Sequence, residues 1–236
     1  QWQSSTTSGS GFTDISGATS NTFNTGTINT VQTTYYQCVV SASGNGCNSI
    51  TSSEATVTVV LDPVVSDQPD DVTICDGTST TLNVVATGGT GTLLYQWQSS
   101  SNGTTFANIS GATSNSYVTP TLNNDTFYKV IITQAASGCL VESTIAKVSV
   151  AKISVQPTTP IDICVGGVIS VFVETTLVPG VSYDYQWQSS TNGMTWNNES
   201  NITAITANFT SDALNATTQF RCEVTTTNPS CTLTSN

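Results

Sequence analysis

The sequence predicts an all-β chain built from tandem Greek-key β-sandwiches. The segment Gln-Trp-Gln-Ser-Ser occurs three times, which places tryptophans at positions 2, 97 and 187. These steps are too long for a solenoid repeat and suit a small domain. Between the tryptophans lie about seven short alternating runs, separated by turn residues and without helical periodicity. About ninety residues with this many strands indicate a Greek-key sandwich.

The tryptophan spacing divides the chain into three repeats. Residues 1–61 are the C-terminal part of a truncated first repeat, residues 62–151 a complete second repeat, and residues 152–236 a third repeat that lacks most of its last strand. Asp62-Pro63 marks the first junction, because proline cannot donate to a β-ladder and restricts the residue before it.

The second repeat shows the expected strands in order. Two edge segments precede a turn at Asp76-Gly77, and a core strand follows the turn. A glycine-rich loop then leads into the tryptophan strand, and three further strands close the repeat. The expected strands are 64–65, 72–74, 80–86, 93–98, 117–118, 126–133 and 145–150.

Composition limits the function classes. Fifteen acidic residues stand against four basic ones, for a net charge of -11. Such a chain repels phosphate backbones and anionic lipid headgroups, so we expect neither nucleic-acid binding nor a membrane-surface role. No apolar run is long enough to span a membrane. The scarcity of lysine and the many Thr and Asn residues are typical of extracellular proteins.

Catalysis has little support in the sequence. The chain contains no histidine, so the common Ser-His and Cys-His nucleophile pairs are absent. No two cysteines have the C-x-x-C spacing of a zinc site, and nothing selects a pair of carboxylates for glycoside chemistry. We expect no enzyme activity and no cofactor. Asp67, Asp70 and Asp71 are a weak candidate for Ca²⁺, although a solvated acidic edge is favoured.

The second repeat resembles an immunoglobulin-superfamily domain of the intermediate type. The resemblance rests on Val72-x-Ile74-x-x-Gly77, Leu82-x-Val84-x-Ala86, Trp97 and Tyr128-x-Val130. It implies that Tyr128 is the corner tyrosine, whose hydroxyl forms a hydrogen bond. Phe220 takes the same place in the third repeat and, without a hydroxyl, would lack this hydrogen bond. It also implies that Cys38 and Cys222 are small buried hydrophobes. The residues expected in the cores are Trp2, Trp97, Trp187, Tyr36, Tyr128, Phe220, Cys38, Val130 and Cys222.

A closer resemblance covers nearly the whole chain. The ordered motifs ICDG or ICVG, YQWQSS, ISGATS, TTYY and GC, followed by an alternating strand, look like the immunoglobulin-like repeats of large surface proteins in Bacteroidota. Such proteins include adhesins used in gliding and attachment, exported by type IX secretion. The resemblance implies an extracellular location at the bacterial cell surface.

The immunoglobulin-like topology bears on how the seven cysteines pair. Cys75 and Cys164 lie beside an early turn, whereas Cys47, Cys139 and Cys231 lie in a late loop. That topology places the turn and the loop at opposite ends of one sandwich, roughly 30 Å apart along a strand. A disulfide needs Cα atoms within about 7 Å.

We therefore prefer a bond between repeats, from Cys75 to Cys231. Cys139, Cys47 and Cys164 would then pair with repeats outside this segment. Two alternatives stay open: pairing within repeats, as Cys75 with Cys139 and Cys164 with Cys231, or free thiols.

The resulting expectation is a non-enzymatic stalk or filament of a bacterial surface adhesin, stiffened by disulfides between neighbouring repeats. The alternatives are a module that binds glycans or other surface proteins, or an accessory region of a secreted hydrolase. A stalk predicts nearly identical surfaces on every repeat, whereas a binding module predicts one divergent aromatic loop. The segment Met194-Thr195-Trp196 is the candidate for such a loop.

Overall fold

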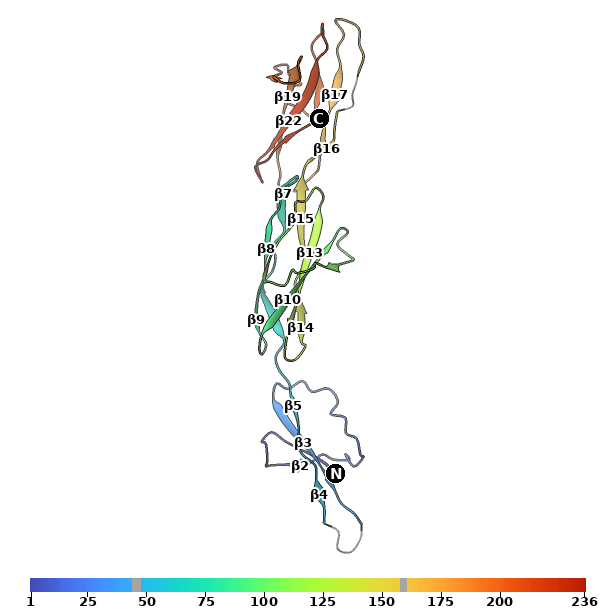
Figure 1. Cartoon of the computed structure of the whole chain (residues 1–236), viewed down its shortest axis with the longest axis vertical. Coiled ribbons are helices and arrows are strands. Elements are labelled where there is room, and N and C mark those ends of the chain that lie inside the picture. Colours follow the sequence, from blue (N-terminus) through green and yellow to red (C-terminus); the bar gives the residue numbers. More distant parts are fainter. Residues whose placement is uncertain (44–47, 158–160) are drawn as a thin grey trace. The chain divides into compact units, whose positions relative to one another are not determined.

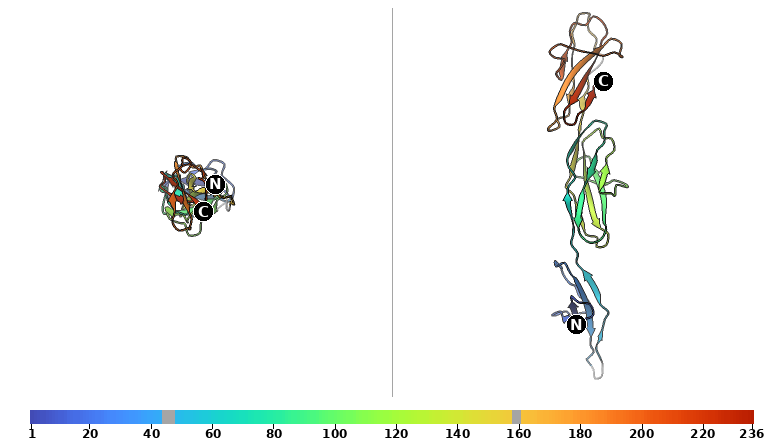
Figure 2. Two further views of the ribbon diagram at one scale, coloured as in Figure 1. Left: turned by 90° about the horizontal axis from the view of Figure 1, so that it is seen from above. Right: turned by 90° about the vertical axis from the view of Figure 1, so that its left-hand side faces the viewer.

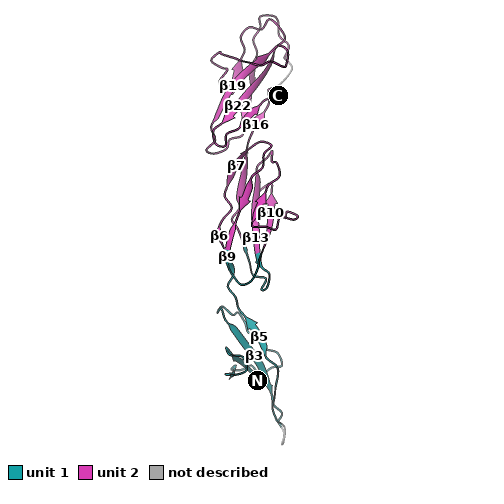
Figure 3. Cartoon of the chain, turned by 60° about the vertical axis from the view of Figure 1, so that its left-hand side comes forward, with its two compact units in different colours: residues 1–64, 87–93, 133–141 teal, residues 65–86, 94–132, 142–236 magenta. Residues whose placement is uncertain are grey.

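The computed structural model describes residues 1–43, 48–157 and 161–236, and these residues form β-strands and no helix (Figure 1, Figure 2). Within this part of the chain, therefore, no helix is long and apolar enough to cross a membrane. Two units result from the internal contacts: residues 1–64, 87–93 and 133–141 form one, and residues 65–86, 94–132 and 142–236 the other (Figure 3).

The strands follow the three repeats. In the first repeat they are β1 (Trp2–Ser5), β2 (Thr13–Asp14), β3 (Thr33–Val40), β4 (Ile50–Thr51) and β5 (Ala55–Thr58). In the second repeat they are β6 (Pro63–Asp67), β7 (Val72–Cys75), β8 (Thr81–Asn83), β9 (Val85–Gly88), β10 (Leu93–Ser100), β11 (Ala107–Asn108), β12 (Ser116–Val118), β13 (Thr126–Gln134), β14 (Leu140–Glu142) and β15 (Ala146–Ala151). In the third repeat they are β16 (Ile153–Val155), β17 (Ser170–Phe172), β18 (Glu174–Thr175), β19 (Tyr183–Ser190), β20 (Asn197–Asn198), β21 (Asn208–Thr210), β22 (Gln219–Thr226) and β23 (Thr232–Thr234).

The second repeat is an immunoglobulin-like Greek-key sandwich, as the sequence predicts. One layer has the order β11-β10-β13-β15-β7, with β14 also paired to β13, and the other contains the pairs β12-β8 and β6-β9. The first strand of the fold thus divides between the layers, since β6 pairs with β9 while β7 runs parallel to β15. The third repeat repeats the plan with β16-β18, β17-β21 and β20-β19-β22-β23.

The expected single core strand over residues 80–86 is divided in the structure. β8 pairs with β12, whereas β9 pairs with β6, and Val84 lies between them. The amide of Val84 donates to the carbonyl of Asn115 at 3.0 Å, and its side chain is buried. The segment is divided because its first half pairs with β12 and its second half pairs with β6.

Aromatic side chains occupy the centres of the second and third repeats. Trp97 and Trp187 are fully buried, and Tyr128 is 2% exposed. The ring centroid of Tyr117 lies 6.0 Å from that of Trp97 and 5.8 Å from that of Tyr128. The third repeat has the same row of three rings, formed by Trp187, Phe209 and Phe220. Val130 and Cys222 are also fully buried, at the two positions expected for them.

Four of the expected core residues are only half-buried: Trp2, Tyr36, Cys38 and Phe220. In the first repeat, β1 to β5 form a single sheet, so the described residues of this repeat place no second layer over Trp2 and its neighbours. Phe220 lines an open cavity in the third repeat. Full burial of such side chains requires a covering layer, which a local sequence pattern does not specify.

No hydrogen bond of the Tyr128 hydroxyl is found among the described residues, so Phe220 loses no such bond at the same place in the third repeat. Burial, with a smaller effect of Tyr117, raises the pKa of Tyr128 to about 12. The ring of Tyr128 contributes through packing, and Phe220 can supply the same packing without a hydroxyl.

The recurring Gln-Trp-Gln motif is explained by hydrogen bonds that it makes in each repeat. The indole of Trp97 donates to the carbonyl of Ser114 at 2.9 Å, and the side-chain amide of Gln96 donates to the carbonyls of Trp97 and Ile109. Gln1 with Trp2 and Gln186 with Trp187 make the equivalent bonds. The motif therefore fastens the following loop to the tryptophan strand.

Candidate functional site

A disulfide joins the second repeat to the third. Cys75 and Cys231 are bonded, with their Cα atoms 5.7 Å apart and a sequence separation of 156. This is the pairing preferred on the immunoglobulin-like topology. The pairings within repeats do not occur, because Cys139 and Cys164 are free.

Cys75 is positioned by the strand pairing of the second repeat. It ends β7 and lies opposite Ala151, the last residue of β15. The next amide, of Asp76, donates to the carbonyl of Ala151 at 3.1 Å. Gly77 then turns the chain with a φ of 71°, a conformation that glycine adopts without strain. Because β15 leads directly into the third repeat, this turn places the Cys75 sulfur at the junction.

Cys231 is positioned by a short loop of the third repeat. Its amide donates to the hydroxyl of Thr226 at 3.0 Å, and its carbonyl accepts from the amide of Thr226 at 3.0 Å. The hydroxyl of Thr226 in turn donates to the carbonyl of Pro229. Cys231 is 6% exposed. The loop is thus closed on itself and presents the sulfur in one defined place.

The connection between the two repeats is a single residue, Lys152, between β15 and β16. The hydroxyl of Thr176 donates to the carbonyl of Val150 at 2.9 Å and accepts from the amide of Lys152 at 3.1 Å. The ammonium group of Lys152 donates to the carbonyl of Asn123 at 2.6 Å and to Asn124 Oδ1 at 2.8 Å. Polar contacts on both sides of Lys152 therefore tie the junction besides the disulfide.

An ion pair stands next to this connection. Lys147 Nζ lies 2.7 Å from Asp125 Oδ2, and the amide of Val150 donates to Asp125 Oδ1 at 2.9 Å. Burial by itself raises the pKa of Asp125. The two hydrogen bonds and the charges of Lys147 and Lys152 outweigh burial, and the pKa of Asp125 is lowered. The carboxylate form is the one that holds β13 to the end of β15.

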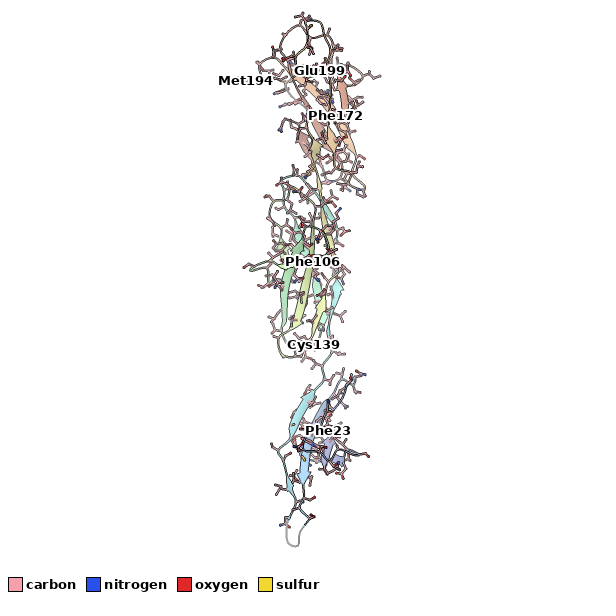
Figure 4. All side chains as sticks on the ribbon, turned by 90° about the vertical axis from the view of Figure 1, so that its right-hand side faces the viewer. Phe23, Phe106, Cys139, Phe172, Met194 and Glu199 are labelled. Carbon is pink, nitrogen blue, oxygen red and sulfur yellow. A yellow bond between two sulfur atoms is a disulfide. The ribbon has the colours of Figure 1, made fainter. Side chains whose placement is uncertain are left out.

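The free cysteines fall into two kinds. Cys139 and Cys164 occupy the positions that Cys231 and Cys75 occupy in the neighbouring repeats. Cys139, which is labelled in Figure 4, is half-buried, and Cys164 is exposed. Cys222 is fully buried, and burial raises the pKa of its thiol to about 12. Cys47, the corresponding residue of the first repeat, lies outside the described residues.

The weak Ca²⁺ candidate is not assembled. Within residues 1–43, 48–157 and 161–236, no three Asp, Glu, His or Cys side chains are grouped so that they could hold a metal ion. Asp71 instead accepts a hydrogen bond from the amide of Lys147 at 2.7 Å, and Asp67 and Asp70 are exposed. The acidic segment thus holds a strand end and faces solvent.

Two aromatic residues, Phe106 and the Trp196 of the candidate binding loop, each have a cation over the ring. Lys129 Nζ lies 5.0 Å from the centroid of Phe106, and the guanidinium carbon of Arg221 lies 4.3 Å from the centroid of Trp196. Phe106 and Trp196 are also half-buried. Met194, beside Trp196, is 88% exposed (Figure 4). These two rings therefore pack against their own repeat.

A serine not predicted to have a role recurs in every repeat, directly after β4, β14 and β23. The hydroxyl of Ser143 accepts from the amide of Val130 at 3.0 Å, and its own amide donates back to the carbonyl of Val130 at 3.0 Å. Ser52 with Cys38 and Ser235 with Cys222 form the same pair of bonds. The signal was available, because a serine stands one to three residues before the alternating run of the first and second repeats.

Solved structures of several tandem immunoglobulin domains are similar to this chain. Extracellular domains 3–5 of Drosophila OTK are 15% identical over 85% of this chain and 69% of theirs, with a TM-score of 0.34. Domains A168–A170 of titin are 13% identical over 86% of this chain and 73% of theirs, with a TM-score of 0.35. No curated protein sequence matches. Each of the three repeats, however, matches one family, at residues 1–61, 66–152 and 153–236, so the chain belongs to the family described as Domain of unknown function (DUF8696).

Proposed function

We propose that this chain is a load-bearing stalk of a bacterial surface adhesin, in which disulfides join each repeat to the next. The proposal assigns the chain no catalysis. The observation that carries it is the disulfide between Cys75 and Cys231, which links two repeats already connected through Lys152. A second covalent link adds nothing to the fold of either repeat alone. It does restrict how far two repeats can separate.

The position of the disulfide determines how tension would pass along the chain. A force applied between residues 1 and 236 reaches Cys75, crosses the sulfur–sulfur bond and leaves from Cys231. The intact bond prevents the intervening residues, which include most of both repeats and the Lys152 connection, from being pulled out to their full length. Such an arrangement suits a segment that holds a cell to a surface.

The proposal extends to other junctions because the half-sites recur. The carbonyl of Cys164 accepts from the amide of Gly167, as that of Cys75 accepts from the amide of Thr78. The carbonyl of Cys139 accepts from the amide of Gln134, as that of Cys231 accepts from the amide of Thr226. The backbone hydrogen bonds at Cys139 thus match those at Cys231, and those at Cys164 match those at Cys75. The proposed partner of each is a cysteine of an adjoining repeat.

Single-molecule pulling on handles at residues 1 and 236 tests the proposal. We expect the oxidised chain to unfold to a shorter contour length than the reduced chain. The difference is the stretch from Cys75 to Cys231, a separation of 156 residues. At ~3.3–3.6 Å per residue this stretch is roughly 50 nm long.

The double substitution C75S/C231S should give the long extension without reductant, and C164S is the matched control that keeps the short one. An oxidised wild-type chain that extends fully would contradict the proposed mechanical role.

The cell-surface location is part of the same proposal. Its support is the disulfide, which persists in oxidising surroundings, together with the motif resemblance and the acidic surface. Antibodies raised against residues 62–236 should label intact cells that make the parent protein, and the label should disappear after brief external protease treatment. Labelling only after permeabilisation would place the chain inside the cell and contradict the location.

A further inference from the structure

Two equivalent loops each contain an asparagine followed by a glycine. Asn102-Gly103 lies between β10 and β11, and Asn192-Gly193 lies between β19 and β20, whereas Asn45-Gly46 lies outside the described residues. In an Asn-Gly pair the glycine leaves the nitrogen of its amide unhindered, so the asparagine side chain deamidates more readily than before any larger residue. Both described asparagines are exposed, and water reaches them. The two loops therefore carry side chains that are open to a spontaneous covalent change.

The glycine of each pair is required by the backbone of its loop. Gly103 has a φ of 71° and Gly193 a φ of 69°, a conformation that side chains other than that of glycine rarely allow. A Cβ at Gly103 would lie 3.3 Å from the ring of Phe127, and one at Gly193 would lie 2.9 Å from Gln219 Oε1. A larger residue at either place would slow deamidation, but it would strain the loop.

The asparagine of each pair closes its loop through the side-chain oxygen. Asn102 Oδ1 accepts from the amides of Thr104 and Thr105, both at 2.9 Å. It also accepts from the hydroxyl of Ser100 at 2.9 Å. Asn192 Oδ1 accepts the three equivalent bonds in its own loop, at 2.8, 2.9 and 3.1 Å. The fold thus uses both members of the reactive pair, one for its oxygen and the other for its backbone.

Deamidation requires the amide nitrogen of the glycine to attack the side chain of the asparagine. The Gly103 nitrogen would lose its proton to hydroxide and form a bond to Cγ of Asn102, and the Nδ2 group would leave as ammonia. Water then opens the five-membered imide to give aspartate or isoaspartate. The reaction consumes one water and releases one ammonia, and it needs no enzyme. Its first step requires that the glycine amide is free to lose its proton and that the asparagine side chain is free to turn.

A buried serine in each loop opposes this first step. Ser100 Oγ accepts from the amide of Gly103 at 3.0 Å, and Ser190 Oγ accepts from the amide of Gly193 at 2.9 Å. Ser100 is 5% exposed and Ser190 2% exposed. The proton of each hydroxyl is donated to the asparagine Oδ1, so the lone pairs of Oγ face the glycine amide. Attack by the glycine nitrogen therefore requires the loop to open.

We propose that Asn102 and Asn192 are modification sites at which the folded loop suppresses deamidation, with Ser100 and Ser190 as the positioning residues. Each serine holds the glycine amide and the asparagine side chain apart with one hydroxyl group. Deamidation then proceeds only through loop opening or unfolding of the repeat. The proposal goes beyond the mechanical role of the disulfide and does not depend on it.

Peptide mass spectrometry of the full chain kept at pH 8 and 37 °C measures conversion to aspartate and isoaspartate at both residues. We expect Asn102 and Asn192 to react at least tenfold more slowly in the folded chain than in the chain unfolded in guanidinium chloride. Equal rates in the folded and unfolded chains would overturn the proposal.

The substitution Ser100→Ala removes the hydroxyl from one loop and leaves the other loop as an internal reference. We expect the rate at Asn102 to rise at least fivefold while the rate at Asn192 stays the same, and Ser190→Ala should give the reverse. The matched control is Ser101→Ala, at the adjacent exposed position without a side-chain hydrogen bond among the described residues. A rate at Asn102 that does not change in Ser100→Ala would overturn the proposal.

Hydrogen exchange distinguishes an effect on the loop from unfolding of the second repeat. In Ser100→Ala the amide of Gly103 should exchange faster, whereas those of Trp97 and Val130, in β10 and β13, should exchange as in the wild-type chain. If Ser100→Ala unfolds the repeat, the wild-type chain in increasing urea provides the test. Deamidation of Asn102 and exchange at Gly103 should then rise by the same factor, because both need the same opening. A rise in one without the other would overturn the proposal.

Discussion

The thiol of Cys222 is enclosed by the core of the third repeat, whereas that of Cys164 is exposed at its end. Both cysteines belong to the third repeat, but the reactivity of their thiols differs because their surroundings differ. Burial raises the pKa of the Cys222 thiol to about 12, so almost no thiolate is present near neutral pH. Cys222 therefore acts as a small apolar side chain, and Cys164 is available to bond.

Alkylation with iodoacetamide at pH 8 should separate these two residues. We expect Cys164 to be modified within minutes in the folded chain, and Cys222 to remain at least a hundredfold less reactive until the chain is unfolded in guanidinium chloride. Peptide mass spectrometry of the two sites gives the rates. Similar rates in the folded chain would show that the core of the third repeat is open to solvent.

At the scale of single elements, one short strand of each repeat is followed directly by a serine: Ser52 after β4, Ser143 after β14 and Ser235 after β23. Ser235 follows β23, and its hydroxyl accepts from the buried amide of Cys222 at 2.7 Å. The side chain thus takes the place of a backbone acceptor at an irregular point of the strand pairing. A buried amide without an acceptor is costly, so this hydroxyl supports the strand beside it.

The substitution Ser235→Ala removes that acceptor. We expect it to lower the free energy of unfolding of the third repeat by ~1–3 kcal/mol, the penalty of an unpaired buried amide. Ser143→Ala should have the same effect on the second repeat, since Ser143 makes the same bonds. Urea denaturation measures both. Ser154→Ala, at an exposed position without a side-chain hydrogen bond among the described residues, should change stability by less than about 0.5 kcal/mol.

At the scale of the whole chain, the second and third repeats are joined by contacts between residues that lie far apart in the sequence. The disulfide closes a loop with a sequence separation of 156 residues, which is long enough to restrict the unfolded chain strongly. Thr176 and Lys152 add polar contacts at the same junction. The junction is thus stabilised both by covalent restriction and by local hydrogen bonds.

Reduction of the disulfide should therefore destabilise the second and third repeats together. We expect C75S/C231S to lower the free energy of unfolding by ~2–4 kcal/mol relative to the oxidised wild-type chain. The control C164S should leave it unchanged within about 0.5 kcal/mol. Urea denaturation with and without reductant provides the comparison. An unchanged midpoint on reduction would show that the bond does not restrict the unfolded chain.

The sequence by itself determined the class of fold, the division into repeats and the inward-facing positions of Trp97, Tyr128, Val130 and Cys222. It could do so because alternation, turn residues and an internal repeat are local signals. The predicted disulfide between Cys75 and Cys231 also rested on local motifs, combined with the assumption of an immunoglobulin-like strand order.

Only the tertiary structure decided how deeply these residues are buried and what their polar atoms contact. Trp2 and Trp187 have the same sequence surroundings, yet Trp2 is half-buried because its layer has no partner in the described residues, whereas Trp187 is fully buried. The bond from Ser235 to Cys222 and the cavity beside Phe220 likewise depend on which strand lies next to which. Burial and pairing are properties of neighbours in space, and a local pattern of residues cannot specify whether those neighbours are present.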